Sequence, residues 1–246
     1  MTATNTTQRL IELGLRGMAT AYERQRDQPA IQTQAFDVRL GDLLDVEAAE
    51  RDTRKIERYL KAAKLRCSQA ALEDVEYRSD RGLDHSQVMA LAEGEWIRRK
   101  QNLILTGATG TGKSWLACAF GNQACRQGFT TYYCTSTRLF EDIARSHADG
   151  SLPKLRRQLI KTQLLIIDDL GIGGIEKHLG PVLLEIIDQQ SMNGALLLTS
   201  QFPTEKWYDL FGDPTIADAI LDRIVHRAHM LPLSGESMRK RKGKKL

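Results

Sequence analysis

The segment Gly107-Ala108-Thr109-Gly110-Thr111-Gly112-Lys113-Ser114 fits the pattern G-x-x-x-x-G-K-[ST]. It follows the apolar run Asn102-Leu-Ile-Leu-Thr and precedes a stretch of helical character that begins near Lys113. The glycines allow backbone N–H groups to surround phosphate oxygens, and the start of a helix adds a favourable dipole. The segment therefore predicts a P-loop in which all eight residues bind the phosphates of ATP.

Two residues of this P-loop and two acids elsewhere carry the predicted chemistry. Lys113 would place a positive charge at the β- and γ-phosphates, and Ser114 would bind a magnesium ion (Mg2+). Asp168 and Asp169 follow the apolar run that begins at Leu164, at the end of a predicted buried strand, where parallel sheets bind their ligands. We expect Asp168 to reach the magnesium ion through water, and Asp169 to polarise the water that attacks the γ-phosphorus.

Polar residues after the next predicted strand and on a later helix are further candidates. Gln201, or alternatively Ser200, follows the run Leu196-Leu-Leu-Thr and could form a hydrogen bond that senses the γ-phosphate. A simple turn is the structural alternative for both residues. Arg223 lies on an apolar helix and is suited to reach the nucleotide of a neighbouring subunit, the alternative being an ion pair on the helix surface.

Short apolar runs alternate with helical stretches through the second part of the chain. This alternation predicts an α/β fold, with a parallel sheet covered by helices on both faces, as in three-layer P-loop NTPases. The five expected strands are residues 102–106, 130–134, 164–168, 195–199 and 230–233.

The first 66 residues are predicted to form a small all-helical domain. Apolar residues recur at helical spacing from Thr7 to Tyr22, and a longer helical pattern runs from Gln34 to Arg66. Residues 67–83 are irregular and acidic, so we predict a linker there. The nucleotide-binding domain is then expected over residues 84–238, followed by a basic tail at residues 239–246.

Two segments are rich in cations. The long N-terminal helix carries Arg54, Lys55, Arg58 and Lys61, which would present positive charge to the phosphates of duplex DNA, the alternative being a solvated basic face. The tail holds six cations and no acid in eight residues, and either contacts a polyanion or acts as a solubilising end.

Composition limits the class of protein. The 246 residues are 41% hydrophobic and 27% charged, which is typical of a globular chain, with a net charge of +4. No stretch is apolar and long enough to be a secretory signal or a membrane span, so we expect a cytoplasmic protein without membrane contact. The four cysteines show neither metal-ligand spacing nor a disulfide framework.

With these residues in hand, the chain resembles the IstB family, the ATPase helpers of transposition. This family lies within the AAA+ group, together with DnaC-like helicase loaders and DnaA-like initiators. The resemblance covers nearly the whole chain. It rests on the segment from Arg58 to Leu65, the P-loop with Trp115, the run Leu164-Leu-Ile-Ile-Asp-Asp-Leu-Gly, Thr199-Ser-Gln-Phe-Pro with Trp207, Ala219-Ile-Leu-Asp-Arg, and Gly235-Glu-Ser-Met-Arg.

The resemblance implies a role for each candidate. It places Lys113 and Ser114 in the Walker A site, Asp168 and Asp169 in the Walker B site, Gln201 at the sensor position and Arg223 at the arginine finger. Gln201 replaces the more common asparagine and Asp169 the more common glutamate, so we expect slow intrinsic hydrolysis. The sequence ends soon after Arg239, leaving no room for a C-terminal helical lid, so neighbouring subunits of an ATP-dependent homo-oligomer would close the site.

The resemblance also implies partners. The expected function is an ATP-dependent, DNA-binding regulator that oligomerises on duplex DNA and delivers target DNA to a transposase, with hydrolysis as a timing switch. A DnaC-like replicative helicase loader would share the core and is the alternative. A P-loop small-molecule kinase is an alternative of another class, although tandem acids favour water activation. The last alternative function is a scaffold that binds ATP without hydrolysing it.

Overall fold

The computed structural model of the protein describes residues 3–172 and 177–238, so the basic tail predicted at residues 239–246 lies outside it. The chain divides into two compact units, Met1–Arg58 and Tyr59–Leu246. Within the described ranges, no helix combines the length and the apolar character that a membrane crossing requires.

The first unit consists of helices: α1 (Ala3–Glu12), α2 (Arg16–Asp27), α3 (Pro29–Gln32) and most of α4 (Phe36–Ala63). The periodic segment Thr7–Tyr22 forms two helices rather than one, because Gly14 adopts φ +77° and interrupts the helical backbone. The long helix ends at Ala63 rather than at Arg66, since Lys64 has φ +54°. Positive φ values end regular helices in both places.

Glu47 of α4 joins two helices of this unit. Its carboxylate accepts hydrogen bonds from the N–H groups of Gly17 (2.8 Å) and Met18 (3.2 Å) in the first turn of α2, whose own N-cap supplies no side-chain acceptor. Arg51 donates to the other oxygen at 2.7 Å. Burial of the carboxyl opposes ionisation, but these hydrogen bonds outweigh it, so the pKa of Glu47 is lowered. Glu47 therefore caps α2 from outside that helix.

We predict that Glu47→Ala destabilises the first unit. Two backbone donors lose their acceptor, and the expected loss is about 1–3 kcal/mol. Hydrogen–deuterium exchange should show reduced protection at the start of α2, while Glu50→Ala, which removes a partly buried acid of the same helix that does not contact α2 by any described hydrogen bond, leaves that protection intact. Because the pKa of Glu47 is lowered in the folded state, its ionised form stabilises that state. This contribution should be lost as pH falls from the ordinary glutamate value through the lowered one, and Glu47→Ala should lack it. Equal exchange in the two variants would contradict the capping role.

The second unit is built on a five-stranded parallel sheet with the order β2-β3-β4-β1-β5. All five predicted strands are present, so the predicted α/β fold is confirmed. Their bounds are β1 (Asn102–Gly107), β2 (Thr131–Thr135), β3 (Leu164–Leu170), β4 (Ala195–Ser200) and β5 (Ala228–Leu233).

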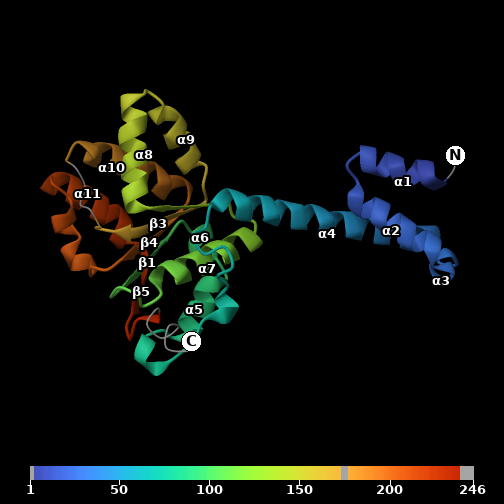
Figure 1. The fold of residues 1–246 in the computed structure, drawn as a ribbon, viewed down its shortest axis with the longest axis horizontal. Helices are drawn as coiled ribbons and strands as arrows, with labels where there is room; N and C mark the ends of the chain where they lie inside the picture. Colours follow the sequence, from blue (N-terminus) through green and yellow to red (C-terminus); the bar gives the residue numbers. More distant parts are fainter. Residues whose placement is uncertain (1–2, 173–176, 239–246) are drawn as a thin grey trace. The chain divides into compact units, whose positions relative to one another are not determined.

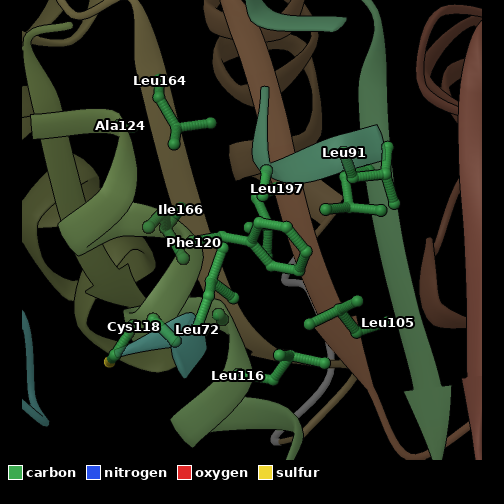
Figure 2. Close-up of a cluster of buried hydrophobic side chains, with 14 of the residues drawn as sticks. Leu72, Leu91, Leu105, Leu116, Cys118, Phe120, Ala124, Leu164, Ile166 and Leu197 are labelled. Atoms are coloured by element: carbon green, nitrogen blue, oxygen red, sulfur yellow. The ribbon is translucent and has the colours of Figure 1, made fainter. Parts of the chain in front are cut away.

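Alternate residues of the central strands enter two different cores. Leu105, Ile166 and Leu197 pack with Phe120 of α7 (Lys113–Arg126), beside α5 (His85–Ala92) and α6 (Glu95–Arg98), as Figure 2 shows for part of this cluster. Their neighbours along the strands face the opposite core, formed with α8 (Ser136–Ala148), α9 (Leu152–Ile160), α10 (Gly180–Asn193) and α11 (Pro214–Val225) (Figure 1). Helices on both faces explain why these strands read as continuous apolar runs.

The segment predicted as a linker, residues 67–83, is part of the second unit. It contains two short 3-10 helices, η1 (Leu72–Asp74) and η2 (Ser79–Arg81). Leu72, Val75 and Leu83 are buried in the same cluster as α7. The sequence did not reveal this packing, because the three buried apolar residues are spaced as in neither a helix nor a strand and lie among acidic and polar residues. The domain boundaries themselves stay a prediction.

Candidate functional site

The P-loop connects β1 to α7, and its glycines have conformations that other residues rarely adopt. Gly107, Gly110 and Gly112 have φ values of +144°, +88° and +98°. A Cβ at Gly107 would overlap the carbonyl oxygen of Leu233, and one at Gly110 would overlap Oγ of Ser237. Backbone conformation and close neighbours therefore both require glycine in this loop.

The lysine of the loop is buried within it. The Nζ of Lys113 donates to the carbonyl oxygens of Gly107 (2.7 Å) and Ala108 (3.0 Å), and the hydroxyl of Thr111 donates to Ala108 at 2.9 Å. These contacts hold the ammonium group beside the backbone that the sequence predicts to bind phosphate.

A cavity of about 810 Å³ lies beside the P-loop. It is lined by Lys113 and Ser114, by Asp169 from β3, and by Gln201, which follows β4. The hydroxyl of Thr109 donates to Oε1 of Gln201 at 2.6 Å, which ties the residue after β4 to the loop after β1. With Thr109, Gly110 and Gly112, seven of the residues proposed for binding and catalysis thus line one cavity, although they come from three separate parts of the chain.

Asp168 is fully buried at the end of β3. Its Oδ2 accepts a hydrogen bond from the Tyr133 hydroxyl (2.6 Å) and its Oδ1 accepts one from the Thr199 hydroxyl (2.5 Å). Of the two acids, only Asp169 is among the described residues that line the cavity. Each oxygen of Asp168 keeps a further lone pair, so its water-mediated contact with magnesium stays a prediction.

Thr199 organises both acids, and the sequence did not single it out. Besides donating to Asp168, its Oγ1 accepts a hydrogen bond from the N–H of Asp169 at 2.9 Å. Asp169 has φ +59°, and its carbonyl oxygen accepts from the Ser136 hydroxyl at 2.8 Å. These two hydrogen bonds from neighbouring elements hold an unusual backbone conformation in place. The sequence signal that could have identified Thr199 is a hydroxyl residue near the end of β4, the strand that pairs with the acid-bearing β3.

Tyr133 and Arg66 extend this polar network, and sequence reasoning assigned neither to the site. Burial, together with the hydrogen bond to Asp168, raises the pKa of Tyr133, so its hydroxyl stays protonated and donates. Arg66 lines the cavity and interacts with the Tyr133 hydroxyl. A cation at the cavity is thereby linked to the buried carboxylate.

The two candidates for the sensor position differ in placement. Ser200 is fully buried; its hydroxyl donates to the carbonyl of Leu170 and accepts from the N–H of Phe202. Gln201 instead lines the cavity. Placement therefore favours Gln201 as the group that meets a nucleotide.

Arg223 lies on α11, outside the set of described residues that line this cavity. Its Nε donates to Oδ1 of Asp188 on α10 at 2.6 Å, and its Nη1 donates to the carbonyl of Ala219 at 2.8 Å. Arg223 therefore forms its ion pair with Asp188 of the neighbouring helix and not with Asp218 or Asp222 of its own helix. Within one chain, the structure does not bring this arginine to the P-loop.

The basic residues of α4 fall into two groups. Arg54 is partly buried and forms ion pairs with Glu50 (3.3 Å) and Glu47 (3.6 Å). Lys55, Arg58 and Lys61 are exposed. Acids of its own helix thus pair with Arg54, whereas the side chains of the other three are more accessible to solvent.

The four cysteines are free thiols. Burial raises the pKa of Cys118 and of Cys134 to about 12, and it also raises the pKa of Cys125. Cys67 is half-buried and lines the cavity.

Comparison with known proteins points to one family. A family model described as IstB-like ATP binding protein matches residues 8–246. A relative from Sinorhizobium fredii, named as an insertion sequence ATP-binding protein, is 42% identical and aligns over 100% of both chains. Another, from Pseudomonas fluorescens, has the same kind of name; it is 45% identical, with 83% of this chain and 88% of the relative covered.

Solved structures show the same fold at low sequence identity. The crystal structure of DnaI is 22% identical, with a TM-score of 0.58 over 72% of this chain and 94% of that chain. The structure of AMPPCP-bound DnaA from Aquifex aeolicus is 18% identical, with a TM-score of 0.58 over 72% and 55% of the two chains. The DnaC helicase loader is 17% identical, with a TM-score of 0.52 over 72% and 99%. These similarities confirm the predicted three-layer α/β fold of the second unit.

We predict that Thr199→Val destabilises the second unit. Valine has nearly the same shape as threonine but lacks the hydroxyl, so Oδ1 of Asp168 and the N–H of Asp169 both lose their hydrogen-bond partner. Each buried group left unsatisfied should cost about 1–3 kcal/mol. Chemical denaturation followed by tryptophan fluorescence measures the loss. Thr199→Ser keeps the hydroxyl and should retain most of the stability; equal losses in both variants would point to the methyl group instead.

Proposed function

The chain belongs to the family of IstB-like ATP-binding proteins, and from this membership we propose that it is an ATPase that oligomerises on duplex DNA and delivers target DNA to a transposase. ATP hydrolysis would act as a timing switch. The observation that carries the proposal is the single cavity shared by Lys113, Ser114, Asp169 and Gln201.

The proposed chemistry assigns one task to each side chain. Lys113 and the amides of the P-loop bind the β- and γ-phosphates, and Gln201 donates a hydrogen bond to the γ-phosphate. Asp169 orients the attacking water by accepting a hydrogen bond from it. Aspartate is one methylene shorter than glutamate, so it reaches that water less well, and slow hydrolysis in the absence of partners is expected.

Magnesium fits the donors of this site. The hydroxyl of Ser114 and the carboxylate of Asp169, which line the cavity, are hard oxygen ligands, and magnesium in such sites is commonly held by one or two protein groups together with substrate phosphates. When bound, the ion would neutralise negative charge on the phosphates. Ser114 would hold it directly and Asp168 through water.

The names of the relatives support the partner assignment. Two relatives are named as insertion sequence ATP-binding proteins, and for a protein of an insertion sequence we propose a transposase as the partner. A replicative helicase loader is the rival. The similarity to the DnaC helicase loader concerns the fold, so it does not favour that alternative. Pull-down with a transposase and with a helicase separates the two proposals.

Arg223 is proposed to complete the site of a neighbouring subunit, and mixing two inactive variants tests both catalysis and assembly. Asp169→Asn should bind ATP but hydrolyse it at least about tenfold more slowly, since its site lacks the group that orients water. Arg223→Ala should be similarly slow because the transition-state charge is not neutralised. A mixture should recover activity, since some interfaces then combine an intact Asp169 with an intact Arg223.

The control for this experiment is Arg227→Ala, which removes an exposed arginine just after the same helix and should leave the ATPase rate unchanged. Unchanged turnover in Asp169→Asn would remove the catalytic assignment. A mixture no faster than its components would remove the proposed role of Arg223 between subunits.

DNA binding is proposed to use the exposed cations of α4. Replacing Lys55, Arg58 and Lys61 together with glutamine should weaken duplex binding and flatten its salt dependence, by up to about 0.9 log units per log unit of salt for each phosphate that the variant no longer neutralises. Fluorescence anisotropy at several salt concentrations measures this. Arg54→Gln should have a smaller effect because Glu47 and Glu50 already pair with Arg54. An unaltered slope in the triple variant would place the DNA-binding surface elsewhere.

A further inference from the structure

One arginine outside the predicted site residues lies against the P-loop. Arg81 of η2 is 6% exposed and lines the cavity beside Lys113. Its Nη1 donates to the carbonyl of Glu76 at 2.8 Å and its Nη2 donates to the carbonyl of Thr111 at 3.1 Å. One guanidinium group therefore joins the segment before α5 to the loop that begins α7.

The hydrogen bond to Thr111 has a direct consequence for the next amide. In a trans peptide, the N–H of a residue points opposite to the carbonyl of the residue before it. With the Thr111 carbonyl turned toward Arg81, the N–H of Gly112 is turned away from Arg81. A Cβ on Gly112 would lie only 3.1 Å from Nη2, so the approach is close on this side of the loop.

Arg81 is itself held by the segment that follows β5. The N–H of Ser234 donates to the carbonyl of Arg81 at 2.9 Å, and the Ser234 hydroxyl donates to the carbonyl of Asp80 at 2.8 Å. The same segment reaches the P-loop directly, since the N–H of Met238 donates to the carbonyl of Gly110 at 2.9 Å. Two outward carbonyls of the loop are thus fixed by donors from distant parts of the chain.

The charge of Arg81 gives a second, independent indication. Within the part of the chain that the structure describes, no carboxylate forms an ion pair with it; its acceptors are neutral carbonyls. A buried cation is costly unless an anion balances it. The phosphates of a nucleotide in the adjoining cavity would supply that anion.

We propose that Arg81 is a positioning residue of the nucleotide site. It fixes the Thr111 carbonyl so that the Gly112 amide faces the phosphates, and the negative charge of the phosphates balances the positive charge of Arg81. This inference rests on the nucleotide binding of the proposed function, but needs neither hydrolysis nor DNA.

Equilibrium titration with a fluorescent ATP analogue and magnesium tests the proposal, using the full chain. Arg81→Met retains much of the side-chain length but removes the charge and all donors, and should raise Kd about tenfold or more. Arg81→Lys keeps the charge but not the planar fork that holds two carbonyls, and should be intermediate. Arg78→Met is the matched control, since Arg78 precedes the same short helix, is only partly buried and pairs with Asp80; it should bind as the wild type does.

Displacement of the analogue by ATP and by AMP separates positioning from damage to the fold. A role through the phosphates predicts that Arg81→Met weakens ATP more than AMP, whereas general destabilisation weakens both alike. Thermal unfolding without nucleotide confirms that each variant is folded, and if Arg81→Met does not fold, Arg81→Lys carries the same comparison. Equal losses for ATP and AMP, or ATP affinity within about twofold of Arg78→Met, would overturn the inference alone. Failure of the wild type to bind ATP would overturn the proposed function as well.

Discussion

Parallel pairing of β3 with β4 and of β4 with β1 is the constraint on which the site depends. Side-by-side strands of one direction end at the same edge of the sheet, so the acids after Ile167, the amide of Gln201 and the loop after β1 meet there. The hydrogen bond between Thr109 and Gln201 and the bonds of Thr199 to both acids make this meeting specific. Where a residue lies along its strand thus matters as much as its chemical type.

The parts that the sequence predicts well are those with a local signature. The five strands, the P-loop and the tandem acids each have a pattern within a few residues, because burial on two faces and close approach to phosphate restrict neighbouring side chains directly. The features missed depend on contacts between distant segments. Nothing in the sequence distinguishes Arg81 from the other arginines, because its contact with Thr111 joins segments 30 residues apart. Residues 67–83 were predicted to be a linker because the buried Leu72 and Val75 follow neither a helical nor a strand repeat.

Charged residues of this chain serve different purposes that their types alone do not reveal. Glu47 and Arg54 are committed to structure within the first unit, whereas Lys55 on the same helix is exposed. In the second unit, Asp168 is buried between two hydroxyl donors while Asp169, its neighbour, lines the cavity. Neighbouring residues of the same charge therefore have distinct environments, and burial with hydrogen bonding decides between them.

The uneven burial of the four thiols makes the protein suited to chemical labelling. Thiol reagents attack the thiolate, and a pKa of about 12 leaves Cys118 and Cys134 almost entirely protonated near neutral pH, behind side chains that also exclude the reagent. Cys67 lines the cavity with Lys113 and Ser114. A reporter group attached to Cys67 would lie in this cavity and would therefore respond to what enters it, without any substitution in the sequence.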